Sequence, residues 1–423
     1  MMANIKEDYK ETELGSIPTS WNVVKLEEVA NYINGFPFKP TQWEKSGKPI
    51  IRIQNLTESS DKINYFNGFI DKKYEVSDGD ILISWSASLG VFKWGKGNAW
   101  LNQHIFKVTN YSPKIFKGYF YFVVGTRLGF MKEKTHGSTM HHITKLAFLD
   151  VKIPIPPLPE QQKIAYVLST VQQAQEKTER VINSLKELKK SMMKHLFSYG
   201  IVGLENNEKV KLKETEVGKV PYAWLESRIK DHSKITTGGT PKTSVNEYYF
   251  PQEVPWMKSG EIQGHKITKI DTYISKLGLE NSNARLLPKG SVVIALAGRG
   301  KTRGTTAVLE VECACNQSVV CIIPTGGLLP YYLHYYLSNL YSYIRNLTGD
   351  EDRTGLNMEL VGKIPLILPT LPEQKQIAEI LSSIDTKVEA EENRKEALEQ
   401  LFKSLLSNLM SAKIRVNNLK IVS

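Results

Sequence analysis

The sequence predicts an α+β protein in which two globular modules are joined by two long helices that form an antiparallel coiled coil. An internal repeat is the first indication of this fold. The segment PPLPEQQKIAYVLSTVQQ, from Pro156, returns as PTLPEQKQIAEILSSIDT, from Pro369, and 372 minus 159 gives a period of 213 residues for the aligned Pro159 and Pro372. Apolar residues at heptad spacing after each copy are the second indication. Two copies are too few for a solenoid, so we expect an intramolecular pseudo-dimer.

Weaker repeats precede each copy of this segment. TELGSIPTSW, from Thr12 to Trp21, matches TEVGKVPYAW, from Thr215 to Trp224, and the pair Asn102-Gln103 matches Asn316-Gln317. The chain therefore divides into module, helix, module and helix, with predicted boundaries of 1–158, 159–204, 205–371 and 372–423.

Each PLPEQ segment is expected to begin a long helix. Pro159 and Pro372 suit the first helical position, and Gly200 suits the position just after the first helix. The predicted seam consists of Ile164, Leu168, Val171, Ile182, Leu185, Met192 and Leu196 in the first helix and Ile377, Leu381, Ile384, Val388, Leu398, Phe402, Leu405 and Leu409 in the second. Such a repeat over about five heptads is typical of a coiled coil.

Polar residues interrupt both seams near their middles, at Gln175 and Thr178 and at Glu391 and Lys395. We expect these polar zones to meet in an antiparallel pair, because polar seam residues restrict register. Two alternatives remain open. Each helix can pair with a separate protein, or both can be ordinary core helices.

The two modules combine strand and helix patterns. Apolar runs bounded by turn residues predict strands at 50–53, 81–85, 292–296 and 319–323. An aromatic-rich helix is expected around Tyr119 in the first module and around Tyr332 in the second. Because aromatic stripes at helical spacing usually face inward, these rings are predicted to pack in the cores.

Composition favours a polyanionic partner. The net charge is +11 and the pI about 9.2, which suits nucleic acid. No apolar run approaches the roughly 20 residues of a membrane-spanning helix, and no secretory signal is visible, so no membrane association is expected. Only Cys313, Cys315 and Cys321 occur, which excludes a disulfide framework and favours the cytoplasm. Their spacing in an apolar strand predicts buried thiols and no metal site.

Catalytic motifs are weak. Ala295 to Thr302 resembles a phosphate-binding loop through Gly300-Lys301-Thr302, but Arg303-Gly304 is a poor helix start, and the first module has no equivalent lysine. No adenine-methyltransferase motif, dinucleotide fingerprint or metal-ligand pattern accompanies it. We therefore expect no catalytic residue, metal or cofactor in this chain. A nucleotide-binding enzyme that uses this loop and a purely structural coiled-coil scaffold remain the alternatives.

Candidate DNA-binding residues are basic, amide-bearing or hydroxyl-bearing residues in predicted loops, since phosphates attract Lys and Arg while base edges bond Arg, Asn, Gln, His, Ser and Thr. Because the Asn-Gln pair is common to modules that otherwise differ, it has a structural interpretation as well. The candidates in the first module are Arg52, Lys93, Lys96, Asn102, Gln103, His104, His136, Ser138, Thr139, His141 and His142. Those in the second are Lys258, Arg299, Lys301, Arg303, Asn316, Gln317, Arg353, Thr354 and Asn357.

This layout resembles the specificity subunit of type I restriction-modification systems, through LPEQQKIAYVLS from Leu158, LPEQKQIAEILS from Leu371, and the paired GSIPTSW and GKVPYAW. The resemblance covers essentially the whole chain. It implies that the modules are target recognition domains, each reading half of a split double-stranded DNA sequence. It also implies that the helices act as a ruler and bind two modification (methyltransferase) subunits, which restriction (translocase/nuclease) subunits join. S-adenosylmethionine, ATP and Mg²⁺ are then expected on those partners.

Overall fold

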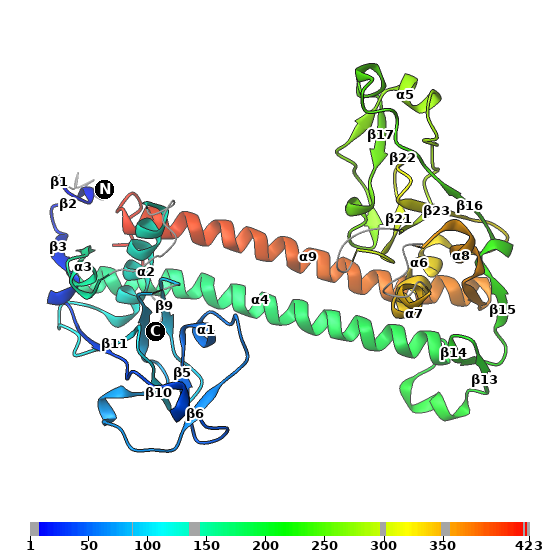
Figure 1. Ribbon diagram of the computed structural model, residues 1–423. Helices are drawn as coiled ribbons and strands as arrows, with labels where there is room; N and C mark the ends of the chain where they lie inside the picture. The colour runs from blue at the N-terminus through cyan, green and yellow to red at the C-terminus, as the bar shows by residue number, and fades with distance from the viewer. Residues whose placement is uncertain are drawn as a thin grey trace. The chain divides into compact units, whose positions relative to one another are not determined.

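The chain forms two compact units, each of which includes half of each long helix. The computed structural model describes residues 8–86, 88–134, 144–296, 302–347, 356–417 and 419–420. Unit 1 comprises residues 1–178 and 394–423, and unit 2 comprises residues 179–393 (Figure 1). Because this division cuts both long helices near their middles, the four predicted domain boundaries stay predictions.

Unit 1 contains two small sheets, and each combines strands that are distant from one another in the sequence. One has the order β4-β11-β8-β9 and the other the order β6-β5-β10-β7. Short antiparallel pairs β1-β2 and β12-β3 flank them. The bounds are β1 (Tyr9–Thr12), β2 (Gly15–Pro18), β3 (Asn22–Lys25), β4 (Asn31–Asn34), β5 (Lys48–Ile51), β6 (Asn64–Phe66), β7 (Glu75–Val76), β8 (Ile81–Ser84), β9 (Gly90–Lys93), β10 (Ala99–Leu101), β11 (Ile105–Thr109) and β12 (Lys152–Ile155).

Unit 2 repeats this plan with different strand lengths. Its larger sheet has the order β16-β23-β20-β21-β18 and its smaller sheet the order β19-β17-β22, while β13-β14 and β15-β24 form the flanking pairs. The bounds are β13 (Leu212–Thr215), β14 (Gly218–Pro221), β15 (Leu225–Arg228), β16 (Ser233–Thr237), β17 (Val254–Met257), β18 (Lys266–Ile267), β19 (Tyr273–Ile274), β20 (Val292–Ala295), β21 (Thr306–Leu309), β22 (Ala314–Cys315), β23 (Val319–Pro324) and β24 (Pro365–Leu368).

The shorter helices cover the sheets. In the two cores, Tyr119 of α2 and Tyr332 of α6 are fully buried, and their hydroxyls donate to the backbone oxygens of Pro154 (2.9 Å) and Ile367 (2.6 Å). The aromatic helices therefore pack inward, as the sequence predicted. The bounds are α1 (Ile53–Leu56), α2 (Lys117–Lys134), α3 (Lys145–Leu149), α5 (Lys276–Glu280), α6 (Pro330–Asn339), α7 (Tyr341–Asn346) and α8 (Met358–Lys363).

The strands predicted at 81–85 and 292–296 each end one residue earlier than expected, and one expected strand is shifted toward the N-terminus. The sequence predicted a strand at 50–53, whereas β5 ends at Ile51 and Ile53 begins α1. The amide of Arg52 donates to Oδ1 of Asn55 (3.0 Å). This side-chain bond favours a turn over a further strand residue.

The long helices are α4 (Leu158–Tyr199) and α9 (Leu371–Met410). Each begins one residue before its proline, so Pro159 and Pro372 occupy the second helical position, where a missing N–H is equally harmless. Gly200 has φ +77° and donates its amide to the Leu196 oxygen (3.0 Å), which is the predicted helix termination.

Within each unit, α4 and α9 lie side by side and run in opposite directions (Figure 1). In unit 1, Gln175 Nε2 donates to the Leu398 oxygen (3.1 Å). In unit 2, Lys186 pairs with Glu392 (2.7 Å) and Lys189 with Asp385 (2.6 Å). Residue numbers therefore increase along α4 while those of the partners decrease along α9, as in an antiparallel pair. The α+β fold class with antiparallel helices is thereby confirmed.

The predicted seam faces inward along both helices. None of its members is exposed, because the apolar stripe packs against the domain cores as well as against the partner helix. Thr178, from the polar zone, is buried too, while a meeting of this zone with Glu391 and Lys395 stays a prediction. Buried are Ile164, Leu168, Ile182, Leu196, Ile377, Leu381, Ile384, Val388 and Leu409; half-buried are Val171, Leu185, Met192, Leu398, Phe402 and Leu405.

In unit 1, a buried ion pair joins the segment after α9 to the first turn of α4. Glu160, in the first turn of α4, accepts from Trp21 Nε1 (2.9 Å) and from Arg415 Nε (2.7 Å), which follows the end of α9. The Glu160 side chain is 5% exposed and that of Arg415 is 16% exposed. The corresponding Glu373 in unit 2 accepts from Trp224 Nε1 at the longer distance of 3.4 Å and bonds Thr370. The segment that follows α9 is therefore part of unit 1.

We predict that Arg415→Met lowers the free energy of unfolding of unit 1 by about 3 to 5 kcal/mol, because Glu160 is left as an unpaired buried charge. Hydrogen exchange of core amides in unit 1 measures this value. The exposed Lys413→Ala is the matched control and should change it by less than about 0.5 kcal/mol. Equal effects of the two substitutions on the free energy of unfolding would contradict a stabilising role of the Glu160–Arg415 ion pair.

Thiol chemistry provides a second prediction. Cys313, Cys315 and Cys321 are free and fully buried, as expected from their strand spacing, and burial raises the pKa of the first two to about 12 and that of Cys321 to about 11. Since the thiolate is the reactive form, none of them should react with iodoacetamide at pH 8 until denaturant is added. Rapid alkylation of the native protein, read by mass spectrometry, would refute this.

Candidate nucleic-acid interface

In unit 1, two parallel strands end side by side and bring several candidate residues together. β5 and β10 pair in parallel, with Leu101 opposite Ile51. Arg52 follows the first strand, and Asn102, Gln103 and His104 follow the second. The Asn102 amide donates to the Ile51 oxygen (3.2 Å), which fixes the two strand ends to each other.

A third segment crosses these strand ends. Phe36 donates its amide to the Leu101 oxygen (2.8 Å) and accepts from the Gln103 amide (2.9 Å). A Cβ atom at Gly35 would lie 2.0 Å from the Asn102 oxygen, so only glycine permits this close approach. The importance of Gly35 was not predicted, although the match of Thr12 with Thr215 also aligns Gly35 with Gly238.

Unit 2 builds the same joint from other residues. β17 and β22 pair in parallel with Met257 opposite Cys315, and the Asn316 amide donates to the Met257 oxygen (2.9 Å). A Cβ at Gly238 would lie 1.7 Å from the Cys315 oxygen, which makes Gly238 the counterpart of Gly35. We name each of these three-segment arrangements, at Gly35, Arg52 and Asn102 and at Gly238, Lys258 and Asn316, a strand-end joint.

The shared Asn-Gln pair has a structural role in unit 2. Asn316 Oδ1 accepts from the Ser318 amide (3.1 Å), and Gln317 Oε1 accepts from the Thr240 hydroxyl (2.7 Å). These bonds shape the turn after β22. The structural interpretation offered for this pair thus gains support, and any role in DNA binding stays a prediction.

The basic residue of each joint is held differently. The Arg52 guanidinium lies 4.7 Å from the Trp43 ring centre, and its Nη1 donates to Asn64 Oδ1 (3.3 Å). Lys258 is exposed, with its ammonium 5.4 Å from the Trp256 ring centre. The joints therefore offer a planar, oriented donor in unit 1 and a mobile point charge in unit 2.

Unit 1 also holds polar atoms without a partner at its joint. Among the described residues, Oδ1 of Asn102 and Nδ1 of His104 are buried and have no hydrogen-bond partner. The His104 ring lies 4.9 Å from that of Trp85, and His104 has φ +70°, an uncommon conformation for this residue type.

Other candidates lie away from the joints. Lys93 pairs with Ile81 at one end of β8, whereas Ser84, at the other end, pairs with Ile105 next to His104. Lys96 pairs with Glu58 (3.3 Å). Lys93 therefore lies at the end of β8 away from His104, whereas Lys96 contacts the segment that follows Arg52 and α1.

In unit 2, Arg303 lies at the same end of β20 as Asn316. The Gly304 amide donates to the Ala295 oxygen (2.9 Å), and the Leu296 amide donates to the Ser318 oxygen (2.9 Å). Asn357 instead caps α8 through its side chain, which accepts from the Leu360 amide (2.9 Å). The candidates that fall outside the described residues are His136, Ser138, Thr139, His141, His142, Arg299, Lys301, Arg353 and Thr354.

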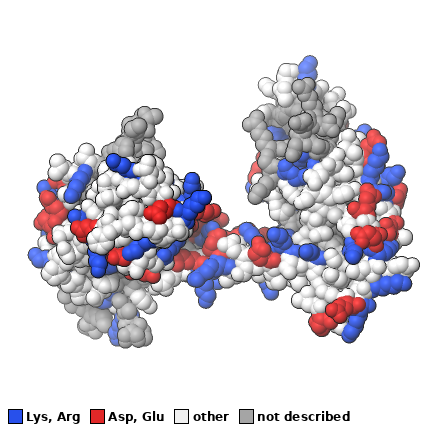
Figure 2. Space-filling view, turned by 60° about the horizontal axis from the view of Figure 1, so that its bottom comes forward, with Lys and Arg blue, Asp and Glu red and all other residues white. Residues whose placement is uncertain are grey.

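Charge is dispersed over the visible faces of the units. Figure 2 shows Lys and Arg interspersed with Asp and Glu, and many lysines are ion-paired, for example Lys152 with Glu13 (2.6 Å) and Lys289 with Glu310 (3.0 Å). In the described part of the chain, no cluster of three or more His, Cys, Asp or Glu side chains suited to a metal ion occurs. Over those same residues, no helix has the length and hydropathy needed to cross a membrane.

Comparison with known proteins identifies relatives along the whole chain. The family model described as the type I restriction modification DNA specificity domain matches residues 18–187 and 221–400. The MjaVIII specificity subunit of Methanocaldococcus jannaschii is 27% identical over 98% of this chain and 97% of its own length. The EcoBI specificity subunit of Escherichia coli is 24% identical over 96% and 84%, respectively. In fold, the S subunit from M. genitalium matches with a TM-score of 0.64 at 14% identity, over 97% of this chain and 98% of that chain.

The joint in unit 2 generates a prediction about salt dependence. If the exposed Lys258 contacts a phosphate, Lys258→Ala should reduce the slope of log K against log salt by about 1, since one fewer counterion is released. Lys269→Ala is the control, because that lysine is exposed and pairs with Asp271 (2.6 Å). Fluorescence anisotropy with target duplex at several salt concentrations measures both slopes. An unchanged slope for Lys258→Ala would remove this residue from the interface.

Proposed function

Because the chain belongs to the family of type I restriction modification DNA specificity domains, we propose that it is the non-catalytic specificity subunit of such a system. In this proposal, the domains of units 1 and 2 are target recognition domains that read a bipartite DNA sequence, one half-site each. The chain itself transfers no methyl group and cleaves no bond.

The observation that carries the proposal is the strand-end joint, which occurs once in each unit with unlike side chains. Arg52 and His104 in unit 1 correspond to Lys258 and Ser318 in unit 2, on the same backbone arrangement. A common scaffold with different donors suits the recognition of two different base sequences. The repeated scaffold therefore supports a target with two unlike halves.

The long helices support the docking of partners. Both present apolar side chains to solvent, namely Tyr166, Val181 and Leu188 on α4 and Leu401 on α9. We propose that these helices bind two modification subunits and that restriction subunits join this complex in the cytoplasm. S-adenosylmethionine, ATP and Mg²⁺ are then bound by the partners.

The decisive experiment co-expresses this chain with its modification subunit in a methylation-deficient host and maps methylated adenines across the genome. We expect one split motif, with two short specified halves separated by a spacer of fixed length. Exchange of residues 8–157 for the first domain of a relative should change one half of the motif only. A continuous motif, or methylation that does not depend on this chain, would contradict the proposal.

The enzyme alternative is tested separately through its loop. Lys301→Ala removes the lysine of the Gly300-Lys301-Thr302 sequence, and ATP hydrolysis is measured for the purified chain with and without duplex DNA. We expect no turnover in either form. Hydrolysis that this substitution abolishes would establish the nucleotide-binding enzyme, and stable complexes without DNA affinity would establish the scaffold.

A further inference from the structure

In unit 2, a buried carboxylate on α9 joins three elements. Asp385 is 8% exposed. Its oxygens accept from Lys189 Nζ on α4 (2.6 and 2.7 Å), and Oδ2 accepts from the Tyr335 hydroxyl on α6 (2.7 Å). A buried carboxylate with charged and neutral donors fixes all of these elements in one geometry.

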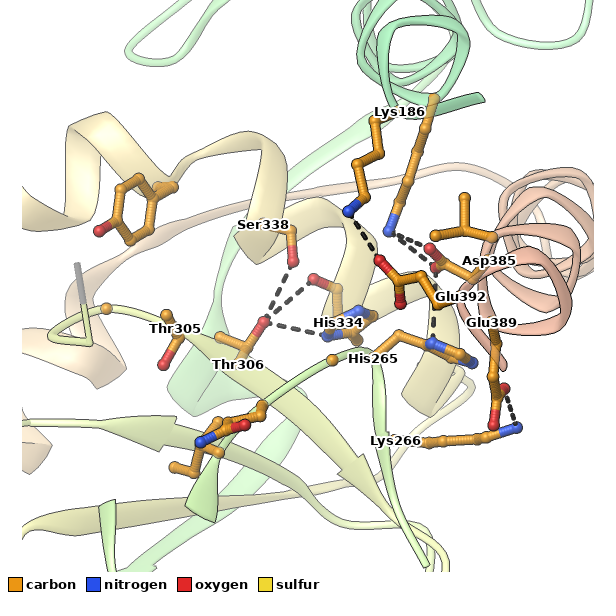
Figure 3. A pocket seen from close by; sticks show the side chains of 17 residues that line it. Lys186, His265, Lys266, Thr305, Thr306, His334, Ser338, Asp385, Glu389 and Glu392 are labelled. Carbon is orange, nitrogen blue, oxygen red and sulfur yellow. Dashed lines mark hydrogen bonds and ion pairs between the residues drawn. The ribbon is translucent and has the colours of Figure 1, made fainter. Parts of the chain in front are cut away.

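The contacts continue from α6 to the sheet that carries Arg303. His334, next to Tyr335, is buried, and burial lowers its pKa to about 3, so its ring is neutral at pH 7. Its Nδ1 lies 3.0 Å from the hydroxyl of Thr306 at the start of β21, which also lies 3.2 Å from the Ser338 hydroxyl. Thr306 is three residues from Arg303. Figure 3 shows the bonds of Thr306 to His334 and Ser338.

The surrounding cavity, of about 740 Å³, has charges that are already matched. Its three lysines pair one-to-one with carboxylates of α9: Lys186 with Glu392, Lys189 with Asp385 and Lys266 with Glu389 (Figure 3). His265 approaches Asp385 at 3.9 Å, but burial lowers its pKa, so the ring is uncharged at neutral pH and this contact is no ion pair. Two of these pairs join α9 to α4, and the third joins α9 to β18 of the domain, so the charges of the three lysines are neutralised within the protein.

Unit 1 has an apolar contact at the corresponding place. The repeat period aligns Asp385 with Gln172, Lys189 with Phe402 and Tyr335 with Phe122. There, the rings of Phe122 and Phe402 lie 6.1 Å apart, and Gln172 bonds to Glu176 on its own helix. The buried contacts of Asp385 with Lys189 and Tyr335 therefore occur in unit 2. At the corresponding place in unit 1, Phe122 packs against Phe402.

We propose that Asp385 is a positioning residue for the second recognition domain. Through Tyr335, His334 and Thr306 it sets the position of the turn that carries Arg303 relative to the helix pair, and so sets discrimination at the second half-site. Gln172 has no such role for the first half-site. This inference rests on the proposed function, because it assigns one half-site to each domain.

The test uses the complete modification complex and its mapped target. Methylation rates are compared between the target duplex and duplexes with one changed base in either half. Asp385→Leu removes the acceptor for Tyr335 and should reduce discrimination at the second half-site by about tenfold, the scale of a single mismatch, while leaving the first half-site unchanged. Gln172→Ala is the matched control and should change neither.

A second variant separates positioning from stability. Asp385→Leu leaves Lys189 without its carboxylate, whereas Asp385→Leu with Lys189→Met replaces the ion pair by apolar side chains and should restore thermal stability. We expect discrimination at the second half-site to stay reduced in the double variant. Recovery of discrimination together with stability, equal losses at both half-sites, or no loss at all would overturn the inference. If the wild-type complex, without any substitution, recognises no two-part target, the proposed function itself is wrong.

Discussion

The first turn of each long helix is fixed to its domain by buried polar contacts, and the rest of each unit is arranged around this anchor. Gln161 bonds the backbone of Phe116, Lys114 and Pro156, and Gln374 bonds Leu329, Gly327 and Pro369 in the same way. Since these amides bond main-chain atoms, the sequence of the domain can vary while the helix stays attached. This constraint explains why the PLPEQ segment repeats almost unchanged between modules whose other residues differ.

Local patterns predicted the elements with strong periodicity. The heptads of α4 and α9, the terminating Gly200 and the inward aromatic rings of α2 and α6 all depend on neighbours within a few turns, so the sequence alone was sufficient. Ile53 was assigned to the wrong element because the Asn55 side chain starts a turn there, and such side-chain bonds leave no periodic signal. Arg415 was missed for a different reason, since its partner Glu160 lies 255 residues away.

The candidate interface was predictable only in part. Arg52, Asn102 and Gln103 were chosen by residue type and come together because two parallel strands end side by side. Lys93 was chosen on the same grounds but lies at the end of β8 away from His104, because strand pairing decides which end of a sheet a loop occupies. Gly35 and Gly238 bear no functional group, and their importance follows only from the backbone that crosses them. The series of contacts through Asp385 likewise depends on segments that are distant in sequence.

The division of the chain has a consequence for the order in which the protein forms during translation. Unit 2 is one continuous stretch, whereas unit 1 also needs residues 394–423, from which Ala412 accepts a bond from Tyr9 and Arg415 bonds Glu160. Residues 394–423 are synthesised after the whole of unit 2, so the Glu160–Arg415 contact of unit 1 cannot form until unit 2 has been translated.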